Sequence, residues 1–227
     1  MFSSRVSLAS PIVFLACLLP SFLYAWNSSD TEIFLKKMEA AYAGVNDYQA
    51  DLEVRTYLKD GSFETKKFLY TFKKPNWMRL DFQSPHAGMT LVYPDKDGKV
   101  GVHYFFTLHL SPDSPLLRGA SGQRIDQTDL GLLIRNISHS LRGQRKGPVE
   151  ESEDEKDIVL RVLADDHFRE GVVTLYRFVI DRNLWLPVEV DESNPGGLLE
   201  RTIIFRNLKT NISLPDRFFE LDEGSLK

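Results

Sequence analysis

The feature that most constrains the fold is a repeated alternation of apolar and polar side chains over short segments of the chain. The clearest case is the segment 48–54, in which Tyr48, Ala50, Leu52 and Val54 alternate with polar residues. This period of two is typical of a β-strand with one face buried and one face in water. The same pattern predicts eight further strands, at 68–72, 77–82, 89–93, 99–110, 157–164, 172–182, 186–192 and 198–207.

Short turns separate these strands. Asp60-Gly61 lies between the first two strands, and this dipeptide tolerates the positive φ that a tight hairpin needs. Comparable turns are expected at 74–76, 95–98, 181–183 and 194–197. Strands joined by tight turns pair antiparallel. Nine or so such strands must curl or close, so we expect a mostly β fold with a strongly curved antiparallel sheet.

Two helices interrupt the strand pattern. The first begins near Ser29 or Asp30 and ends at Gly44, and the second spans 129–142 with Asp129 as its cap. Residues at helical spacing form one apolar face on each helix: Ile33, Phe34, Met38, Ala41 and Tyr42 on the first, and Leu130, Leu133, Ile134, Ile137 and Leu141 on the second. Residues 111–128, which are rich in Ser, Pro, Gly and Asp, are expected to form a loop.

The first 25 residues have the order of a secretory signal peptide. Arg5 supplies a positive charge, an apolar stretch runs from Ile12 to Tyr24, and Ala25 is a small residue at the cleavage position. We therefore expect an exported, periplasmic protein whose mature chain, residues 26–227, forms a single domain. The alternative is a lipoprotein anchored at Cys17, which is the one cysteine of the sequence.

Motifs that carry chemistry are missing from the sequence. It has no phosphate-binding glycine loop, dinucleotide fingerprint, zinc-protease helix or glycine-flanked nucleophilic serine. His103 and His109 would share a face of one uninterrupted strand, but a zinc site needs a third ligand. A net charge of −4 gives no electrostatic footprint for nucleic acid. We expect no catalytic residue, no metal, no cofactor and no nucleic-acid partner.

Six segments, which together span nearly all of the mature chain, carry a family resemblance. They are 34–38, 45–52, 72–80, 131–136, 202–208 and 214–219, including Lys74-Pro75-Asn76 after a strand and Leu214-Pro215-Asp216 near the end. In this order they resemble the LolA-like superfamily of periplasmic carriers of outer-membrane lipoproteins. The resemblance implies an unclosed antiparallel β-barrel whose helices cover an apolar cavity.

By resemblance, the function is non-covalent carriage of acylated lipoproteins or lipids toward the outer membrane. The implied partners are these cargoes, an inner-membrane transporter and an outer-membrane acceptor, and the protein is expected to be a monomer. The alternation of side chains and the apolar stripe of the second helix then predict the residues that line the cavity. They are Leu52, Val54, Met78, Leu80, Phe82, Leu91, Tyr104, Leu133, Ile134, Ile137 and Phe178.

Three alternatives follow from the same residues. The interior could be an ordinary core filled by its own side chains, because composition does not distinguish a filled core from a cavity. The helix at 129–142 could be a lid that opens or a fixed core helix. The protein could be a periplasmic sensor or interaction module that binds a protein partner through the same sheet, because a fold does not determine a function.

Overall fold

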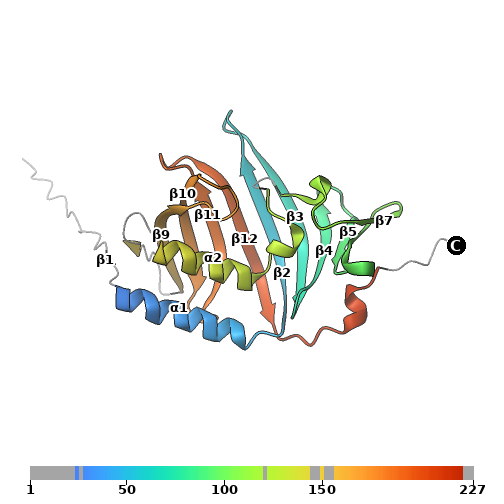
Figure 1. Cartoon of the computed structure of the whole chain (residues 1–227), viewed down its shortest axis with the longest axis horizontal. Helices are drawn as coiled ribbons and strands as arrows, with labels where there is room; N and C mark the ends of the chain where they lie inside the picture. The colour runs from blue at the N-terminus through green and yellow to red at the C-terminus, as the bar shows by residue number, and fades with distance from the viewer. Residues whose placement is uncertain (1–23, 26–27, 120–121, 144–148, 151–155, 222–227) are drawn as a thin grey trace, which may run out of the picture.

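The computed structural model describes residues 24–25, 28–119, 122–143, 149–150 and 156–221. Apart from Tyr24 and Ala25, the predicted signal peptide and Cys17 lie outside these residues, as do residues 151–155, which are mostly acidic. The described part of the chain forms one antiparallel sheet of 12 strands, in the order β1-β8-β9-β10-β11-β12-β2-β3-β4-β5-β6-β7 (Figure 1). The sheet is not closed, since β1 and β7 are its two edges.

The strands agree closely with the alternating segments of the sequence. On one side of the sheet are β2 (Asp47–Tyr57), β3 (Phe63–Lys73), β4 (Trp77–Ser84), β5 (Thr90–Tyr93), β6 (Val100–His103) and β7 (Thr107–Leu110). On the other side are β1 (Tyr24–Ala25), β8 (Val149–Glu150), β9 (Asp157–Asp165), β10 (Val173–Asp181), β11 (Leu186–Ser193) and β12 (Leu199–Thr210). β12 pairs with β2 and joins the two sides, with Phe205 opposite Leu52.

The predicted single strand at 99–110 is wrong, because the structure divides it into β6 and β7. Val100 pairs with Leu110, and His103 pairs with Thr107, so the two strands form a hairpin. The tip of this hairpin is the run of three aromatic residues Tyr104, Phe105 and Phe106, where the alternation of the sequence breaks down. His103 and His109 therefore lie on neighbouring strands instead of one strand.

Both predicted helices are present, and they cover the concave face of the sheet. α1 (Ser28–Ala43) contacts β11, and α2 (Leu130–Arg142) contacts β9, β11 and α1 (Figure 1). In α1 Leu35 and Met38 are fully buried, whereas Ile33, which was expected on the apolar face, is 54% exposed. The apolar face of α1 is thus centred on Phe34, Leu35 and Met38, about 40° from its expected centre.

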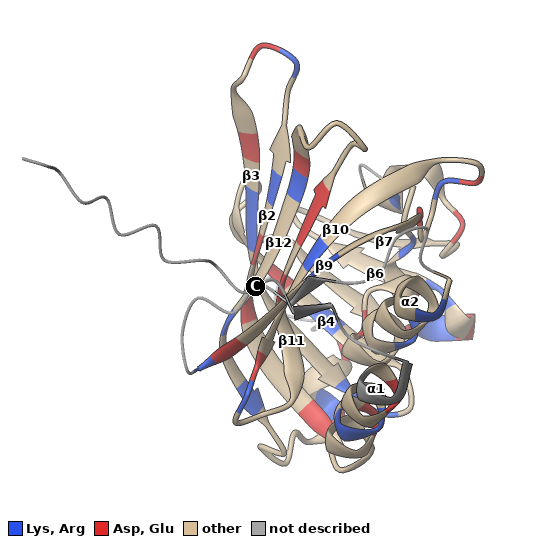
Figure 2. Ribbon diagram, turned by 90° about the vertical axis from the view of Figure 1, so that its left-hand side faces the viewer, with Lys and Arg blue, Asp and Glu red and all other residues tan. Residues whose placement is uncertain are grey.

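The convex face of the sheet is charged. Figure 2 shows Lys, Arg, Asp and Glu residues along the strands on the side away from α1 and α2. Arg177 of β10 bridges Glu189 and Asp191 of β11 at 2.8 and 3.1 Å, and Arg55 bridges Glu53 within β2. The alternation therefore separates a wet convex face from an apolar concave face over most of the sheet.

One part of the convex face is covered by the segment after β12. The short 3₁₀ helix η4 (Asp216–Phe219) lies against β4, and Phe219 and Leu214 form a small second core with Val92. Lys73 Nζ donates to the carbonyl of Leu214 at 2.7 Å, which ties this segment to β3. The C-terminal segment thus supports the β3–β5 region from the side opposite the helices.

Candidate functional site

The concave face holds most of the residues that the sequence predicts for the cavity. Its side chains form one continuous apolar cluster under the helices. Seven of the eleven predicted residues are buried within this cluster: Leu52, Met78, Leu80, Leu91, Ile134, Ile137 and Phe178. Phe178 and Ile137 are 0% exposed, so the part of the concave face beneath the helices is densely filled by side chains.

Three more of the predicted residues, Val54, Phe82 and Leu133, are only partly buried at the margin of the cluster. Ile203 of β12, which the sequence reasoning did not select, lies directly opposite Val54 and is also partly exposed. Val102, which is opposite Leu91, and Met89 also pack against the cluster and are partly exposed. The concave face therefore presents accessible apolar surface toward the ends of the strands that carry the hairpin tips.

Tyr104, the eleventh predicted residue, is not in the cluster, and its expected burial is wrong. It lies in the β6–β7 turn with 39% of its surface exposed, and its ring packs on Phe105 at 4.1 Å between centroids. Phe105 and Phe106 are 78% and 66% exposed. The expectation rested on continuing the alternation of one long strand, and the hairpin turn ends that alternation at His103.

The N-terminal end of α2 is held by tyrosines from three different elements. Tyr42 of α1 donates to Asp129 Oδ1 at 3.2 Å, and Asp129 in turn caps α2 by accepting from the backbone of Leu132. The hydroxyl of buried Tyr48 accepts from the backbone N–H of Leu130 at 2.9 Å. A third hydroxyl, on Tyr70, contacts Thr128 at 3.3 Å. These contacts fix where the helix begins.

The opposite end of α2 is also anchored. Ser140, which is fully buried, contacts Nε2 of His167 at 2.7 Å, and the imidazole stacks on the ring of Tyr176 at 4.2 Å. Burial lowers the pKa of His167 to about 4, so the ring is neutral at pH 7. On the solvent side, Arg142 bridges Glu32 of α1 at 3.0 Å. With both ends held, α2 has the contacts of a fixed core helix.

The loop before α2 covers the other half of the concave face. Ile125 is buried in the apolar cluster and Leu117 packs against it. Thr128 contacts the sulfur of Met78 at 3.5 Å. The sequence reasoning described this segment as a loop and missed its role as a cover, although Ile125 is an isolated apolar residue in a polar stretch and could have indicated it.

A buried ion pair on the concave face was also missed. Glu192 of β11 and Arg201 of β12 are directly opposite each other, and each is 5% exposed. Arg201 Nη2 donates to Glu192 Oε1 at 2.5 Å. The signal in the sequence is that Arg201 shares the phase of Ile203 and Phe205, which places a charge among apolar residues.

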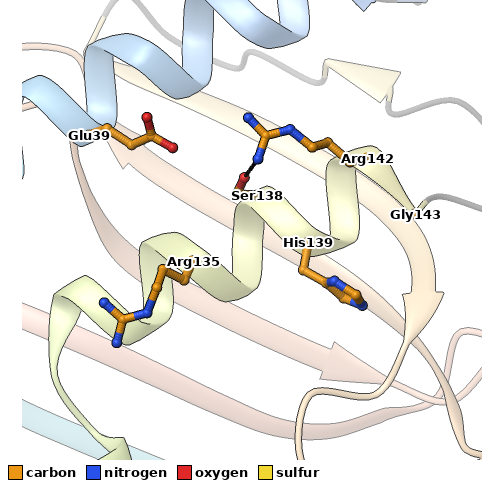
Figure 3. A pocket seen from close by; sticks show the side chains of 6 residues that line it. All are labelled: Glu39, Arg135, Ser138, His139, Arg142 and Gly143. Carbon is orange, nitrogen blue, oxygen red and sulfur yellow. Dashed lines mark hydrogen bonds between the residues drawn. The ribbon is translucent and has the colours of Figure 1, made fainter.

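A groove of about 560 Å³ lies between α1 and α2, outside the sheet (Figure 3). It is lined by Glu39, Arg135, Ser138, His139, Arg142 and Gly143. These residues are mostly polar or charged, and all but Ser138 are exposed, so the groove has the wrong chemistry for an acyl chain. It was not predicted from the sequence.

The structure gives two further results for the described residues. Among them, no cluster of three or more His, Cys, Asp and Glu side chains has an arrangement able to bind a metal ion. Within the same residues, no helix combines the length and the apolar character needed to cross a bilayer. His109, considered above as a ligand, pairs with Asp95 at 2.6 Å instead.

Comparison with known proteins gives a match at the level of structure only. No model of a protein family and no curated protein matches the sequence. The crystal structure of MucB is 17% identical, with a TM-score of 0.50, over 87% of this chain and 64% of its own, so the chain spans less than two thirds of MucB.

Two other crystal structures align with this chain over nearly their whole length. The LolA superfamily protein NE2245 from Nitrosomonas europaea is 14% identical, with a TM-score of 0.40, over 85% of this chain and 98% of its own. The Mycobacterium tuberculosis lipoprotein LppX is 9% identical, with a TM-score of 0.46, over 83% and 99%. At such identities the likeness concerns the fold alone.

Proposed function

From the LolA-like fold of this chain, we propose that it is an exported, non-enzymatic carrier that binds the acyl chains of lipoproteins or lipids on the concave face of its sheet. The observation that carries the proposal is the apolar concave face itself. Its buried cluster continues into partly exposed residues, among them Val54, Phe82 and Ile203. An acyl chain that covers apolar surface of this kind removes it from water, which lowers the free energy of the system.

The proposal also requires that the space between the concave face and its cover can enlarge to admit an acyl chain. Beneath α2 the cluster is filled, whereas toward the hairpin tips the cover is a loop with short 3₁₀ turns, η2 (Pro115–Leu117) and η3 (Ile125–Gln127). Such a cover buries few side chains and is easier to displace than a helix anchored at both ends. We therefore place the entry of the acyl chain between this loop and β12–β2.

A binding experiment with a matched control tests the proposal. Replacing Ile203 by Asn puts a polar group on the accessible concave face, and replacing Ile33 by Asn makes the same change on the exposed surface of α1. We expect Ile203→Asn to weaken binding of a fluorescent fatty-acyl probe by about tenfold, the effect of losing about 1.4 kcal/mol of apolar contact. Ile33→Asn should bind as the unchanged protein does.

Organic extraction of the purified protein, followed by mass spectrometry, provides a second readout. An acyl lipid in the extract would support the carrier, while failure of the protein to bind any acyl probe would rule the carrier out. Loading through an inner-membrane transporter and delivery to an outer-membrane acceptor belong to the same proposal. They predict that the protein takes up acylated cargo from one membrane and releases it to another.

One observation favours the second candidate, a module that binds a protein partner. The β6–β7 turn exposes Phe105 and Phe106 at an edge of the sheet, and exposed aromatic residues are enriched at protein interfaces. Under this alternative, changing both phenylalanines to Ser abolishes partner binding and leaves acyl binding unchanged. Co-purification with and without the two substitutions distinguishes the two functions.

A further inference from the structure

The buried ion pair Glu192–Arg201 lies on the concave face, where the packing of the apolar cluster does not require charged residues. Taking two charges out of water costs several kcal/mol per ion before their attraction is counted, so an apolar pair would serve the core equally well. The two residues are cross-strand partners and each is 5% exposed. A charged pair buried on the apolar concave face calls for an explanation in terms of what it contacts.

The register places this pair at one end of the accessible apolar surface. Along β12, Arg201 and Ile203 are two residues apart and share the concave face, and Ile203 is opposite Val54 of β2. Glu192 is opposite Tyr176, which is fully buried. An acyl chain lying over Ile203 and Val54 would therefore have its polar end beside the guanidinium.

The cover loop already puts a carbonyl group at this position. The side-chain amide oxygen of Gln123 lies 3.5 Å from Arg201 Nη1, and its amide nitrogen donates to the backbone carbonyl of Gln127 at 3.0 Å. The contact between Gln123 and Arg201 is at the long limit of a hydrogen bond, and Gln123 is only partly buried. A neutral amide carbonyl thus occupies, weakly, the place that a ligand's carbonyl would take.

We propose that the Glu192–Arg201 pair recognises the carbonyl group of an esterified or amidated acyl chain, with the ligand's carbonyl oxygen replacing that of Gln123. This inference rests on the proposed function. It narrows the ligand class from acyl lipids in general to acyl esters and amides, the linkages that attach acyl chains to glycerol and to proteins.

The balance of charge at the site is the reason for preferring esters and amides over free fatty acids. Arg201 supplies N–H donors, and the carboxylate of Glu192 cancels its positive charge at 2.5 Å. A neutral ester or amide carbonyl can accept from such a donor without a charge of its own. The carboxylate of a free fatty acid would meet that of Glu192 in surroundings of low dielectric, where like charges repel strongly. The pair therefore discriminates against free fatty acids.

The test uses two probes that differ only at the acyl head: a fatty acid labelled with a fluorophore near its methyl end, and the methyl ester of the same acid. Both are titrated at pH 8 against the full chain. The unchanged protein should bind the ester about tenfold more tightly than the acid, which corresponds to about 1.4 kcal/mol of repulsion between the acid's carboxylate and that of Glu192. Glu192→Gln should remove this preference by strengthening binding of the acid.

Glu189→Gln is the matched control, because Glu189 is on the same strand and also pairs with an arginine, Arg177, but on the convex face. It should keep the preference for the ester. If Glu192→Gln does not fold, Gln123→Ala replaces it. Removing the competing carbonyl should then strengthen binding of the ester about threefold and leave the acid unaffected.

The outcomes separate the inference from the function on which it rests. If neither probe binds the unchanged protein, the carrier function and the inference both fall. If both probes bind equally well, and neither Glu192→Gln nor Gln123→Ala alters the ratio of their affinities, the acyl carrier stands and the role of the ion pair is overturned.

Discussion

At the scale of single residues, His167 links the stability of the fold to pH. Its pKa is about 4 in the folded chain, because of burial, against about 6.5 when unfolded. Because the folded chain keeps His167 neutral, protonation of this histidine does not reduce the stability of the fold above pH 6.5. Stability is lost as the pH falls from 6.5 toward 4, by up to about 3 kcal/mol, because protonation then favours the unfolded chain.

We therefore expect the free energy of unfolding, measured with urea, to fall by about 2 kcal/mol more between pH 7 and pH 5 in the unchanged protein than in His167→Gln. Asp166, whose pKa is lowered to about 2 by hydrogen bonds from Arg169 and Thr174 that outweigh its burial, titrates below this window. His139→Gln, a change at an exposed histidine of α2, is the control. Equal pH dependence in all three proteins would contradict the role of His167.

Single residues are also where reading the sequence was least successful. Alternation correctly places Leu52, Met78 and Phe178 in the apolar cluster, because period two determines the face of a residue inside a strand. It fails for Tyr104, which lies in a turn where no period applies. It also does not identify Arg201 as buried, since a charged residue in the apolar phase of a strand is usually attributed to solvent.

At the scale of elements, α2 differs from the lid that its position suggested. Ile137 is 0% exposed, and tyrosines at one end and His167 at the other tie the helix to the rest of the fold. Gly131 even brings the helix so close to the ring of Tyr42 that a Cβ there would overlap it. The apolar stripe in the sequence is compatible with both a lid and a fixed helix. The contacts at the two ends of α2, which only the structure reveals, distinguish them.

The prediction for α2 is that Ile137→Asp unfolds the domain. Burying an unpaired carboxylate at a site with no solvent access costs several kcal/mol, which is comparable with the total stability of many domains. Leu116→Asp, at an 81% exposed position of the cover loop, should leave the fold intact. Circular dichroism at room temperature measures both. A folded Ile137→Asp protein with weakened acyl binding would restore the lid.

At the scale of the whole molecule, the order of helix and strands was predictable from the sequence and the sheet order was not. Turn residues and alternation reveal neighbours along the chain, such as β2 and β3. No local signal shows that β12 pairs with β2, since that pairing joins segments from opposite ends of the domain. The concave face, and the accessible surface at Ile203 and Val54, exist only through this pairing.

The export proposal also belongs to this scale. If residues 1–25 are a cleaved signal peptide, the protein in the periplasmic fraction begins at Trp26 and lacks β1, so β8 becomes an edge of its sheet. Intact-mass measurement and N-terminal sequencing test this directly. Ala16→Trp is expected to leave the cleavage site unchanged, whereas Ala25→Trp should block cleavage. A mature chain that begins with an acylated Cys17 would contradict the prediction and make the protein membrane-anchored.

The pairing of β12 with β2 has a consequence for how the chain reaches its native state. β9–β11 lie on one side of β12 in the sheet and β2–β7 on the other, and β12 is synthesised after all of these strands. A nascent or translocating polypeptide that lacks residues 199–210 has two half-sheets with uncovered edges, which are prone to aggregation. Such a non-local closure folds slowly, so a chaperone that holds the polypeptide until its last strand emerges would raise its yield.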